Sequence, residues 1–387
     1  MDGLRAVEDS WLPAREPQRC GSSSEGAQAR GEEAVTAGSL FKHPVNIGLD
    51  SGGSLFEASA YDLQGLNLVV GFKGAGKSHL AKAMLLNLTR HKAGCLVFGV
   101  NDEYSRLDMG RDGWPKPDLK DFFVKLRPGE TLKFPLSDIE PEVLVNVMEA
   151  LGLRDASLAE FSEVVGGIGQ NLLSLDTLKD KIKEKVTTPS VRGAIVRRLR
   201  MLEDTGLIND DLEQGQLANA LFQLNEGKTL VVNLKGLAKP AMRTVVQVLL
   251  SNLLNLLEAR KLEPIFLFAE EAHLYIDRAD IEDLVTRMRH LGLWQFYVTN
   301  TPTSLPELLV RQTDNLFCFY LSLPDDVKYI APASGLEPDV LQRLVTALPP
   351  RHFLAVGQAT EGYPVILRNR ELDVLAAGET RYRFLEP

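Results

Sequence analysis

The sequence predicts an α/β fold in which a largely parallel sheet is covered by helices. Short apolar runs alternate along most of the chain with segments whose apolar residues recur every three or four positions. The first of these runs, 66–70, leads directly into a glycine-rich loop and then into a helical pattern. Strands that alternate with helices form parallel sheets with both faces covered.

Eight apolar runs are predicted to be strands, at 66–70, 95–100, 228–234, 264–269, 294–299, 315–321, 352–357 and 363–368. Helices are expected at 77–91, 240–260 and 279–291, and Gly292 is a plausible C-cap for the last of them. Apolar residues at helical spacing through about 137–225 predict a helical bundle inserted between the second and third strands.

Composition divides the chain into three parts. Residues 1–44 are rich in Gly, Ser, Glu, Ala and Arg with little periodicity, so we expect a disordered N-terminal arm. Residues 45–136 and 226–387 are expected to form one α/β core, and 137–225 the inserted bundle.

Charge and cysteine content exclude several classes. A net charge of −9 argues against a protein that coats nucleic acid by bulk charge, although a local basic channel is compatible with it. The three cysteines are too scattered for a disulfide framework or a zinc site, which fits a reducing cytoplasm. The longest apolar stretch, 245–257, is too short and too polar to span a bilayer, so no membrane contact is expected.

The loop after the first strand reads G-F-K-G-A-G-K-S, a pattern typical of nucleoside triphosphate binding. Its glycines permit conformations closed to residues with a Cβ, so that N–H groups at a helix start form an anion nest. Lys77 is expected to reach the β- and γ-phosphates of ATP, and the Ser78 hydroxyl to ligate Mg²⁺. The residues expected to line the nucleotide site are Gly71, Gly74, Ala75, Gly76, Lys77, Ser78 and His79.

Two acids follow the strand at 264–269. In P-loop ATPases one acid at such a position holds Mg²⁺ through water, and a neighbouring acid polarises the attacking water. We expect Glu270 to take the first role and Glu271 the second. The alternative is structural, because acids also stabilise the start of a following helix.

The next strand ends in Thr299-Asn300-Thr301-Pro302. Because parallel sheets bind ligands at the carboxyl ends of their strands, Thr299 or Asn300 is a candidate contact for the γ-phosphate or the water. A plain turn is the alternative. Arg289, at the end of the preceding helix, is either a surface charge or a finger that reaches a neighbour's nucleotide.

Four blocks in order, GFKGAGKS, FGVNDEYS, FLFAEEAH and RHLGLWQFYVTNTP, resemble the HerA–FtsK superfamily of ring-forming DNA translocases, and its HerA branch most closely. The resemblance covers about residues 45–370, and Asp102-Glu103-Tyr104 matches the Gly-Glu-Tyr of the family. It implies a RecA-like core, ATP hydrolysis at subunit interfaces, a hexameric ring with helicase-like translocation of double-stranded DNA, and a nuclease partner. It also makes Arg289 the expected trans-acting finger, ahead of Arg287 and Arg311.

The sequence departs from the family pattern at three site positions. Glu270 replaces an Asp, Asn300 replaces a Gln, and Thr301 replaces a basic residue. Catalytic geometry is sensitive to displacements of about 1 Å, so slow turnover is one alternative. The rival functions are a type IV secretion or conjugation motor, and a slow nucleotide-binding ring that organises an effector nuclease in phage defence.

Two basic clusters are candidates for DNA contact. One follows the third strand and the other lies on a helix of the insert; they comprise Lys235, Lys239 and Arg243, and Arg197, Arg198 and Arg200. Either cluster could contact phosphates without sequence choice. A solvated helix face is the alternative for both.

Overall fold

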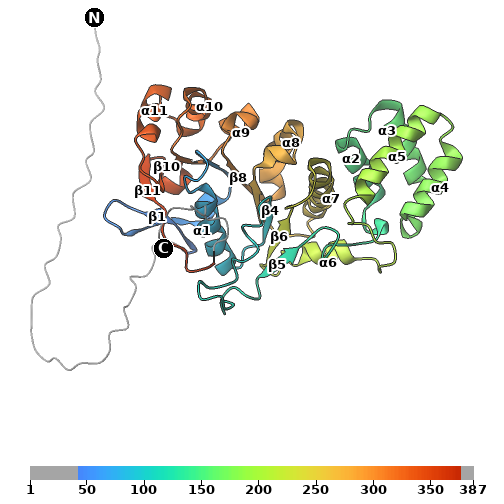
Figure 1. Ribbon diagram of the computed structural model, residues 1–387, viewed down its shortest axis with the longest axis horizontal. Helices are drawn as coiled ribbons and strands as arrows, with labels where there is room; N and C mark the ends of the chain where they lie inside the picture. Colours follow the sequence, from blue (N-terminus) through green and yellow to red (C-terminus); the bar gives the residue numbers. More distant parts are fainter. Residues whose placement is uncertain (1–41, 376–387) are drawn as a thin grey trace, which may run out of the picture. The chain divides into compact units, whose positions relative to one another are not determined.

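The computed structural model describes residues 42–375, so nearly all of the arm expected at 1–44 lies outside the described residues. Within them, one sheet has the strand order β2-β1-β11-β10-β9-β3-β8-β7-β4-β6-β5 (Figure 1). The strands are β1 (Pro44–Leu49), β2 (Leu55–Ser59), β3 (Leu66–Val70), β4 (Cys95–Gly99), β5 (Phe123–Leu126), β6 (Thr229–Asn233), β7 (Ile265–Glu270), β8 (Leu293–Thr299), β9 (Asn315–Phe319), β10 (His352–Gly357) and β11 (Val365–Arg368).

The sheet is parallel from β9 to β5 and antiparallel from β9 to β2. β3 lies between β9 and β8, and β8 pairs with β7 on its other side. The register places Val70 opposite Thr299, and Val298 opposite Glu270. The last residues of β3, β7 and β8 therefore meet at one edge, as the α/β fold class predicts.

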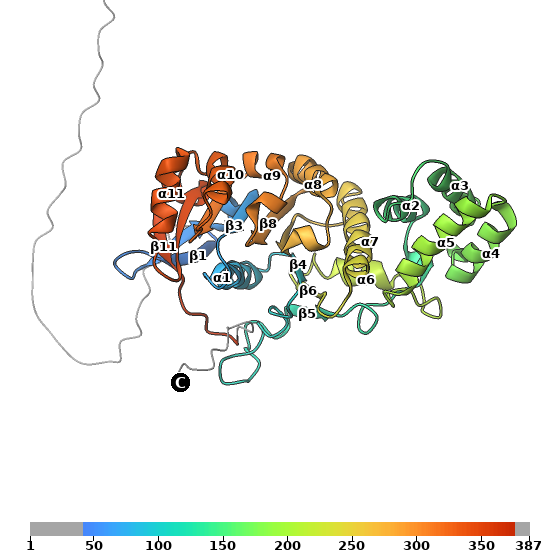
Figure 2. The ribbon, with the colours of Figure 1, turned by 45° about the horizontal axis from the view of Figure 1, so that its top comes forward.

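Helices cover both faces of the sheet (Figure 2). One face is covered by α1 (Lys77–Arg90), which packs on β1, β3, β4 and β8. The other face is covered mainly by α7 (Lys239–Glu258), α8 (Arg278–Leu291), α9 (Glu307–Arg311), α10 (Pro324–Ser334) and α11 (Pro338–Thr346). Short 3₁₀ helices lie at Ala60–Leu63, Leu136–Asp138, Gln170–Leu172, Ala272–Leu274, Pro302–Ser304 and Gln358–Thr360.

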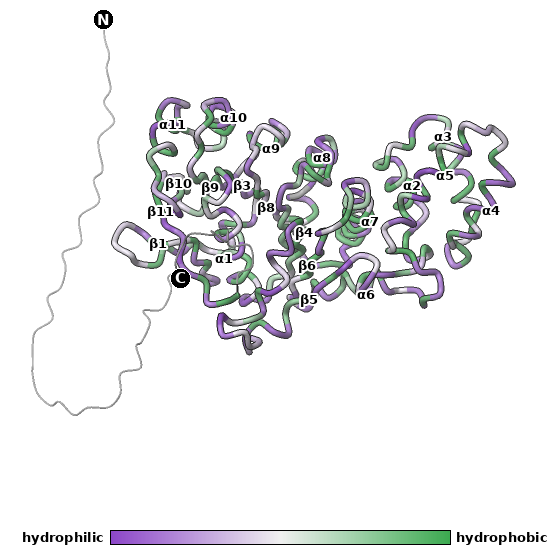
Figure 3. Tube along the Cα trace, viewed as in Figure 1, coloured by the Kyte–Doolittle hydropathy of each residue, from purple (hydrophilic) through white to green (hydrophobic). Residues whose placement is uncertain are grey.

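Successive strand residues divide between two cores, because side chains alternate across a sheet. Leu96 and Phe98 of β4 join the core under α7 and α8, whereas Cys95 and Val97 join the core under α1. Figure 3 shows hydrophobic residues gathered along the strands of the sheet. Burial raises the pKa of the Cys95 thiol to about 12, so this cysteine is an inert core residue.

Five helices lie between β5 and β6, within the range expected for the inserted bundle. They are α2 (Pro141–Ala150), α3 (Asp155–Gly166), α4 (Leu175–Lys185), α5 (Pro189–Glu203) and α6 (Gln216–Phe222). Helices α2 and α5 contact α7, and the apolar residues of the bundle continue the core on that face of the sheet.

Three strands escaped the sequence analysis: β1, β2 and β5. β5 has four residues and ends the parallel side of the sheet, and β2 ends the antiparallel side. Edge strands are short and carry polar residues, so their periodicity is weak. No helix in the described part of the chain has both the length and the apolarity needed to cross a membrane.

Candidate nucleotide-binding site

The loop between β3 and α1 is held open by glycines. Gly71, Gly74 and Gly76 have φ angles of 149°, 82° and 118°, which disfavour residues with a Cβ. Close neighbours impose a second constraint at two of them. A Cβ on Gly71 would lie 2.5 Å from the Phe319 Cβ, and one on Gly76 would lie 2.5 Å from the Asn369 Nδ2. Ala75 completes the loop turn, its amide donating to the Phe72 carbonyl at 3.1 Å.

Lys77 begins α1 and folds back over its own loop. Its Nζ donates to the Phe72 carbonyl at 3.0 Å, and the residue is only 7% exposed. Burial lowers the pKa of Lys77, although the nearby carboxylates of Glu271, Glu270 and Glu103 oppose that shift. A buried cation beside a loop of backbone N–H groups provides a strong site for phosphate.

Ser78 and Glu270 meet across the sheet edge, 192 positions apart in sequence. The Ser78 Oγ donates to the Glu270 Oε1 at 2.5 Å, and Glu270 is 4% exposed. Its Oε2 is buried and has no hydrogen-bond partner among residues 42–375. An unpaired carboxylate oxygen beside a hydroxyl fits Mg²⁺, which takes oxygen ligands from one or two carboxylates and from substrate phosphates.

Glu270 also has a strongly perturbed pKa. Burial and the carboxylate of Glu103 raise the pKa of Glu270 to about 7, against the Ser78 hydrogen bond and the charge of Lys82. Glu103 follows β4 and forms an ion pair of 2.8 Å with Lys82 on α1. The site therefore gathers three glutamates and two lysines at one edge of the sheet, and the shifted pKa values of Lys77 and Glu270 are typical of functional sites.

Glu271 is oriented by its backbone and by the next strand. Its φ of 52° is in the left-handed region, which is uncommon for a non-glycine residue and is often found at functional sites. The Thr299 Oγ1 donates to the Glu271 Oε2 at 2.9 Å, and Thr299 is 1% exposed. Thr299, a candidate phosphate contact from the sequence, thus positions the acid of the neighbouring strand.

Asn300 and His79 lie at the same edge with different surroundings. Asn300 is exposed at the end of β8, and its Oδ1 accepts a hydrogen bond from the Thr301 Oγ1 at 2.8 Å. The His79 ring Nε2 lies 2.6 Å from the carbonyl oxygen of Arg370, a residue far along the chain.

The candidate finger arginines are not near this edge. Arg289 pairs with Asp314 at 3.0 Å, and Asp314 also accepts from the amide of Leu66, the first residue of β3. Arg289 therefore lies at the amino end of the strand whose carboxyl end carries the loop. The other two candidates also pair locally: Arg287 with Glu258 and Asp283, and Arg311 with Glu307.

Sequence reasoning overlooked three members of the site. Lys82 has no motif of its own, and Glu103 was noted only as part of the family pattern. Asn369, whose side-chain amide donates to the Gly76 carbonyl at 2.9 Å, is 293 positions away. Only its place directly after a strand, where ligand-contacting residues gather, could have marked it.

The fold and the site define a P-loop NTPase with a RecA-like core. The sequence profile described as "Helicase HerA, central domain" matches residues 66–253, which include the loop and the bundle. This match covers just under half of the chain and agrees with the sequence resemblance to the HerA–FtsK superfamily of P-loop ATPases. A search of curated proteins finds no significant match.

Solved structures share the fold at low sequence identity. VirB4 of Thermoanaerobacter pseudethanolicus superposes with a TM-score of 0.61 at 13% identity, covering 87% of this chain and 99% of VirB4. The unbound, monoclinic form of the bacterial conjugative coupling protein TrwBdeltaN70 gives 0.59 at 12% identity, covering 86% and 90%. TrwB in complex with the non-hydrolysable GTP analogue GDPNP gives 0.56 at 12% identity, covering 83% and 89%.

Proposed function

We propose that this protein is a cytoplasmic, ATP-hydrolysing motor that assembles as a homo-oligomeric, hexameric ring and translocates double-stranded DNA in the manner of HerA. The observation that carries the proposal is the meeting of Ser78 with Glu270, and of Thr299 with Glu271, at the loop edge of the sheet. The match to the HerA central-domain profile supports ATP as the nucleotide, because the superfamily that the sequence resembles consists of P-loop ATPases.

Different residues of this chain bind the phosphates, hold the metal ion and activate the water. The loop N–H groups and Lys77 bind the phosphates, while Ser78 and Glu270 would hold Mg²⁺. The bound ion would neutralise charge on the phosphate oxygens. Glu271, held by Thr299, accepts a proton from the attacking water as a general base. Asn300 lies beyond the same strand end, within the region where that water would be oriented.

The positions of the candidate arginines support the proposed ring. Phosphoryl transfer is accelerated by an arginine that stabilises the developing charge. The three candidate arginines are ion-paired on α8 and α9, and Arg289, the leading one, lies near the amino end of β3. Its side chain is 68% exposed and therefore accessible to a neighbouring protomer, although its partner Asp314 is only 10% exposed. We infer that Arg289 of a neighbouring protomer completes each site.

ATP turnover tests this proposal. The protein is incubated with ATP and Mg²⁺, with and without naked duplex DNA, while phosphate release and particle size are followed. We expect hydrolysis that duplex DNA stimulates and a particle several times the protomer mass. If wild type and Glu271→Gln hydrolyse ATP equally slowly, the motor proposal is wrong, and a slow nucleotide-binding scaffold for a nuclease becomes the better account.

A second candidate is a motor of the conjugation or type IV secretion class. It is favoured by the superposition on VirB4 and TrwB over most of each chain. The two proposals differ in cargo, so naked duplex DNA separates them. Robust hydrolysis that duplex DNA leaves unchanged would favour the secretion-type motor.

A further inference from the structure

A short segment after the last strand runs back along α1. We call residues 369–374 the strap; they follow β11 directly. Its residues Leu372 and Val374 are each 2% exposed and join the core under α1. Val374 also forms an antiparallel bridge with Gly110. The strap is therefore packed onto the domain along its length.

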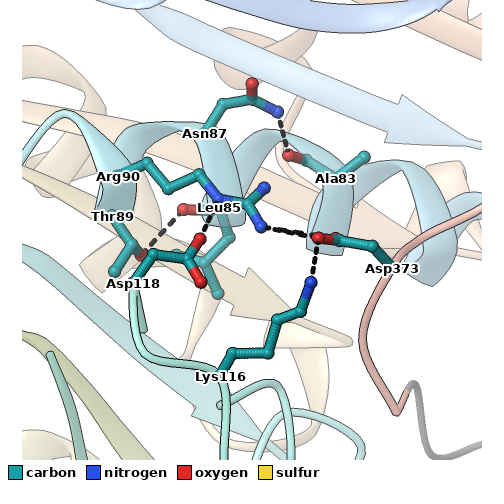
Figure 4. A network of polar contacts seen from close by, with 8 residues as sticks. All are labelled: Ala83, Leu85, Asn87, Thr89, Arg90, Lys116, Asp118 and Asp373. Atoms are coloured by element: carbon teal, nitrogen blue, oxygen red, sulfur yellow. Dashed lines mark hydrogen bonds and ion pairs between the residues drawn. The ribbon is translucent and has the colours of Figure 1, made fainter. Parts of the chain in front are cut away.

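Ion pairs hold the far end of the strap (Figure 4). The Asp373 Oδ2 lies 3.0 Å from the Arg90 Nη2 at the end of α1 and 2.6 Å from the Lys116 Nζ. Although burial opposes it, the hydrogen bond from Lys116 and the charge of Arg90 hold the pKa of Asp373 below its ordinary value. Arg90 also pairs with Asp118 at 2.8 Å, so the anchor is a network of four charges.

The near end of the strap contacts the phosphate loop. The Asn369 side-chain Nδ2 donates to the Gly76 carbonyl at 2.9 Å, and its backbone amide donates to the Arg351 carbonyl at 2.9 Å. The Arg370 carbonyl lies 2.6 Å from the His79 Nε2. The strap thus contacts the residues on both sides of Lys77 and Ser78.

The contact between Gly76 and Asn369 depends on the chemistry of both residues. The missing Cβ of Gly76 leaves room for the Asn369 amide, which a Cβ would approach to 2.5 Å. The Asn369 Oδ1, in turn, is buried without a hydrogen-bond partner in the described chain. An unpaired buried acceptor is unfavourable, and an apolar side chain would avoid it. The favourable contact of this side chain is therefore the hydrogen bond that its amide N–H donates to the phosphate loop.

We propose that Asn369 is a positioning residue of the nucleotide site, kept in place by the strap. In a trans peptide the C=O and N–H groups point in opposite directions. Holding the Gly76 carbonyl therefore aims the N–H of Lys77 toward the phosphates. The Gly76 carbonyl also accepts the Leu80 amide at 3.1 Å, and a carbonyl can accept both bonds. This inference rests on the proposed function, since it assumes that the loop binds a nucleotide.

The test measures MgATP affinity and stability without nucleotide for wild type, Lys77→Ala, Asn369→Ala and Asn225→Ala. Asn225 is the matched control, because its Nδ2 also donates to a backbone carbonyl, that of Lys261 at 3.0 Å. We expect Asn369→Ala to weaken MgATP binding roughly fivefold or more, because the Lys77 N–H is then no longer held toward the phosphates, and to lower the unfolding midpoint without nucleotide no more than Asn225→Ala does. Asn225→Ala should leave the affinity unchanged.

A double-mutant cycle tests the role of the strap. Asp373→Asn should weaken MgATP binding in the wild-type background and add nothing to Asn369→Ala, because both act through the same contact. If Lys77→Ala weakens binding but Asn369→Ala does not, the positioning role is overturned while nucleotide binding stands. If Lys77→Ala also binds as wild type does, the proposed function itself fails, and this inference with it.

Discussion

Two regions of the protomer differ in how far their polar side chains are buried and hydrogen-bonded. One is the edge of the sheet that carries the phosphate loop, and the other is the pair of helices α8 and α9, which carry the candidate arginines. At the loop edge, Lys77, Glu270 and Thr299 are all less than 10% exposed, and each forms a hydrogen bond within the site, with Phe72, Ser78 and Glu271 respectively. On α8 and α9, Arg289 and Arg311 are 68% and 66% exposed, and each forms one ion pair, with Asp314 (10% exposed) and Glu307 (65% exposed). The first region is buried and preorganised, whereas the arginine side chains of the second are exposed.

This difference indicates which part of the proposed mechanism depends on a neighbouring protomer. A preorganised site supplies phosphate binding and a general base without help. β3 has five residues and spans roughly 16 Å, so Arg289 at its amino end does not reach the loop at its carboxyl end. The same arginine is available to an adjoining protomer. Substitutions at the loop edge and on α8 are therefore expected to have different effects on ATP turnover and binding.

The largest effect is expected at Arg289. Arg289→Ala should lower ATP turnover roughly 10³-fold, the lower range for an arginine finger, while MgATP binding changes little. Arg311→Ala is the matched control, since Arg311 has similar exposure and also pairs with one acid. Steady-state phosphate release measures both. Equal turnover for the two variants would remove Arg289 from the mechanism.

Glu270 should make stability depend on pH in the absence of Mg²⁺. Its pKa of about 7 in the folded protein lies above its ordinary value of 4.5, so the folded state resists ionisation. The penalty is full above pH 7 and disappears as the pH falls toward 4.5. Glu270→Gln should therefore be more stable than wild type at pH 8 by at most about 3 kcal/mol, and equally stable near pH 4.5. Denaturant unfolding at the two pH values measures this, and a difference independent of pH would contradict it.

Glu271 should affect chemistry rather than binding. Glu271→Gln removes the general base and should lower turnover roughly 10²-fold with MgATP affinity retained. Single-turnover hydrolysis and equilibrium binding separate the two quantities. A parallel loss of affinity would assign Glu271 to phosphate or metal binding instead.

Thr299 should show a smaller effect of the same kind. Thr299→Val keeps the shape of a buried side chain but removes the donor to Glu271, and we expect turnover to fall roughly tenfold at unchanged affinity. In a Glu271→Gln background the same change should have little further effect. Additive losses would mean that Thr299 acts independently of Glu271.

Much of the fold was predictable from sequence because its signals are local. The run 66–70 and the loop after it are contiguous, and the alternation of strands and helices gave the parallel sheet. The edge strands β2 and β5 gave no comparable signal, because short edge strands bury little apolar surface, and β1, which lies beside β2, was also missed.

The candidate site was predictable only in part. The spacing of the glycine-rich loop pointed to Lys77 and Ser78. Glu270 and Glu271 were singled out because they directly follow a predicted strand. The contacts of Lys82 with Glu103 and of Asn369 with Gly76 depend on how the chain folds back on itself. A hydrogen bond between residues 293 positions apart leaves no periodic trace in the sequence.

Mixing two inactive variants tests the shared site most directly. Lys77→Ala protomers keep Arg289, and Arg289→Ala protomers keep the loop. If they co-assemble at random in equal amounts, about one quarter of the interfaces join an intact loop to an intact arginine. We expect the mixture to hydrolyse ATP although neither variant does so alone. A mixture that forms mixed rings and remains inactive would contradict it.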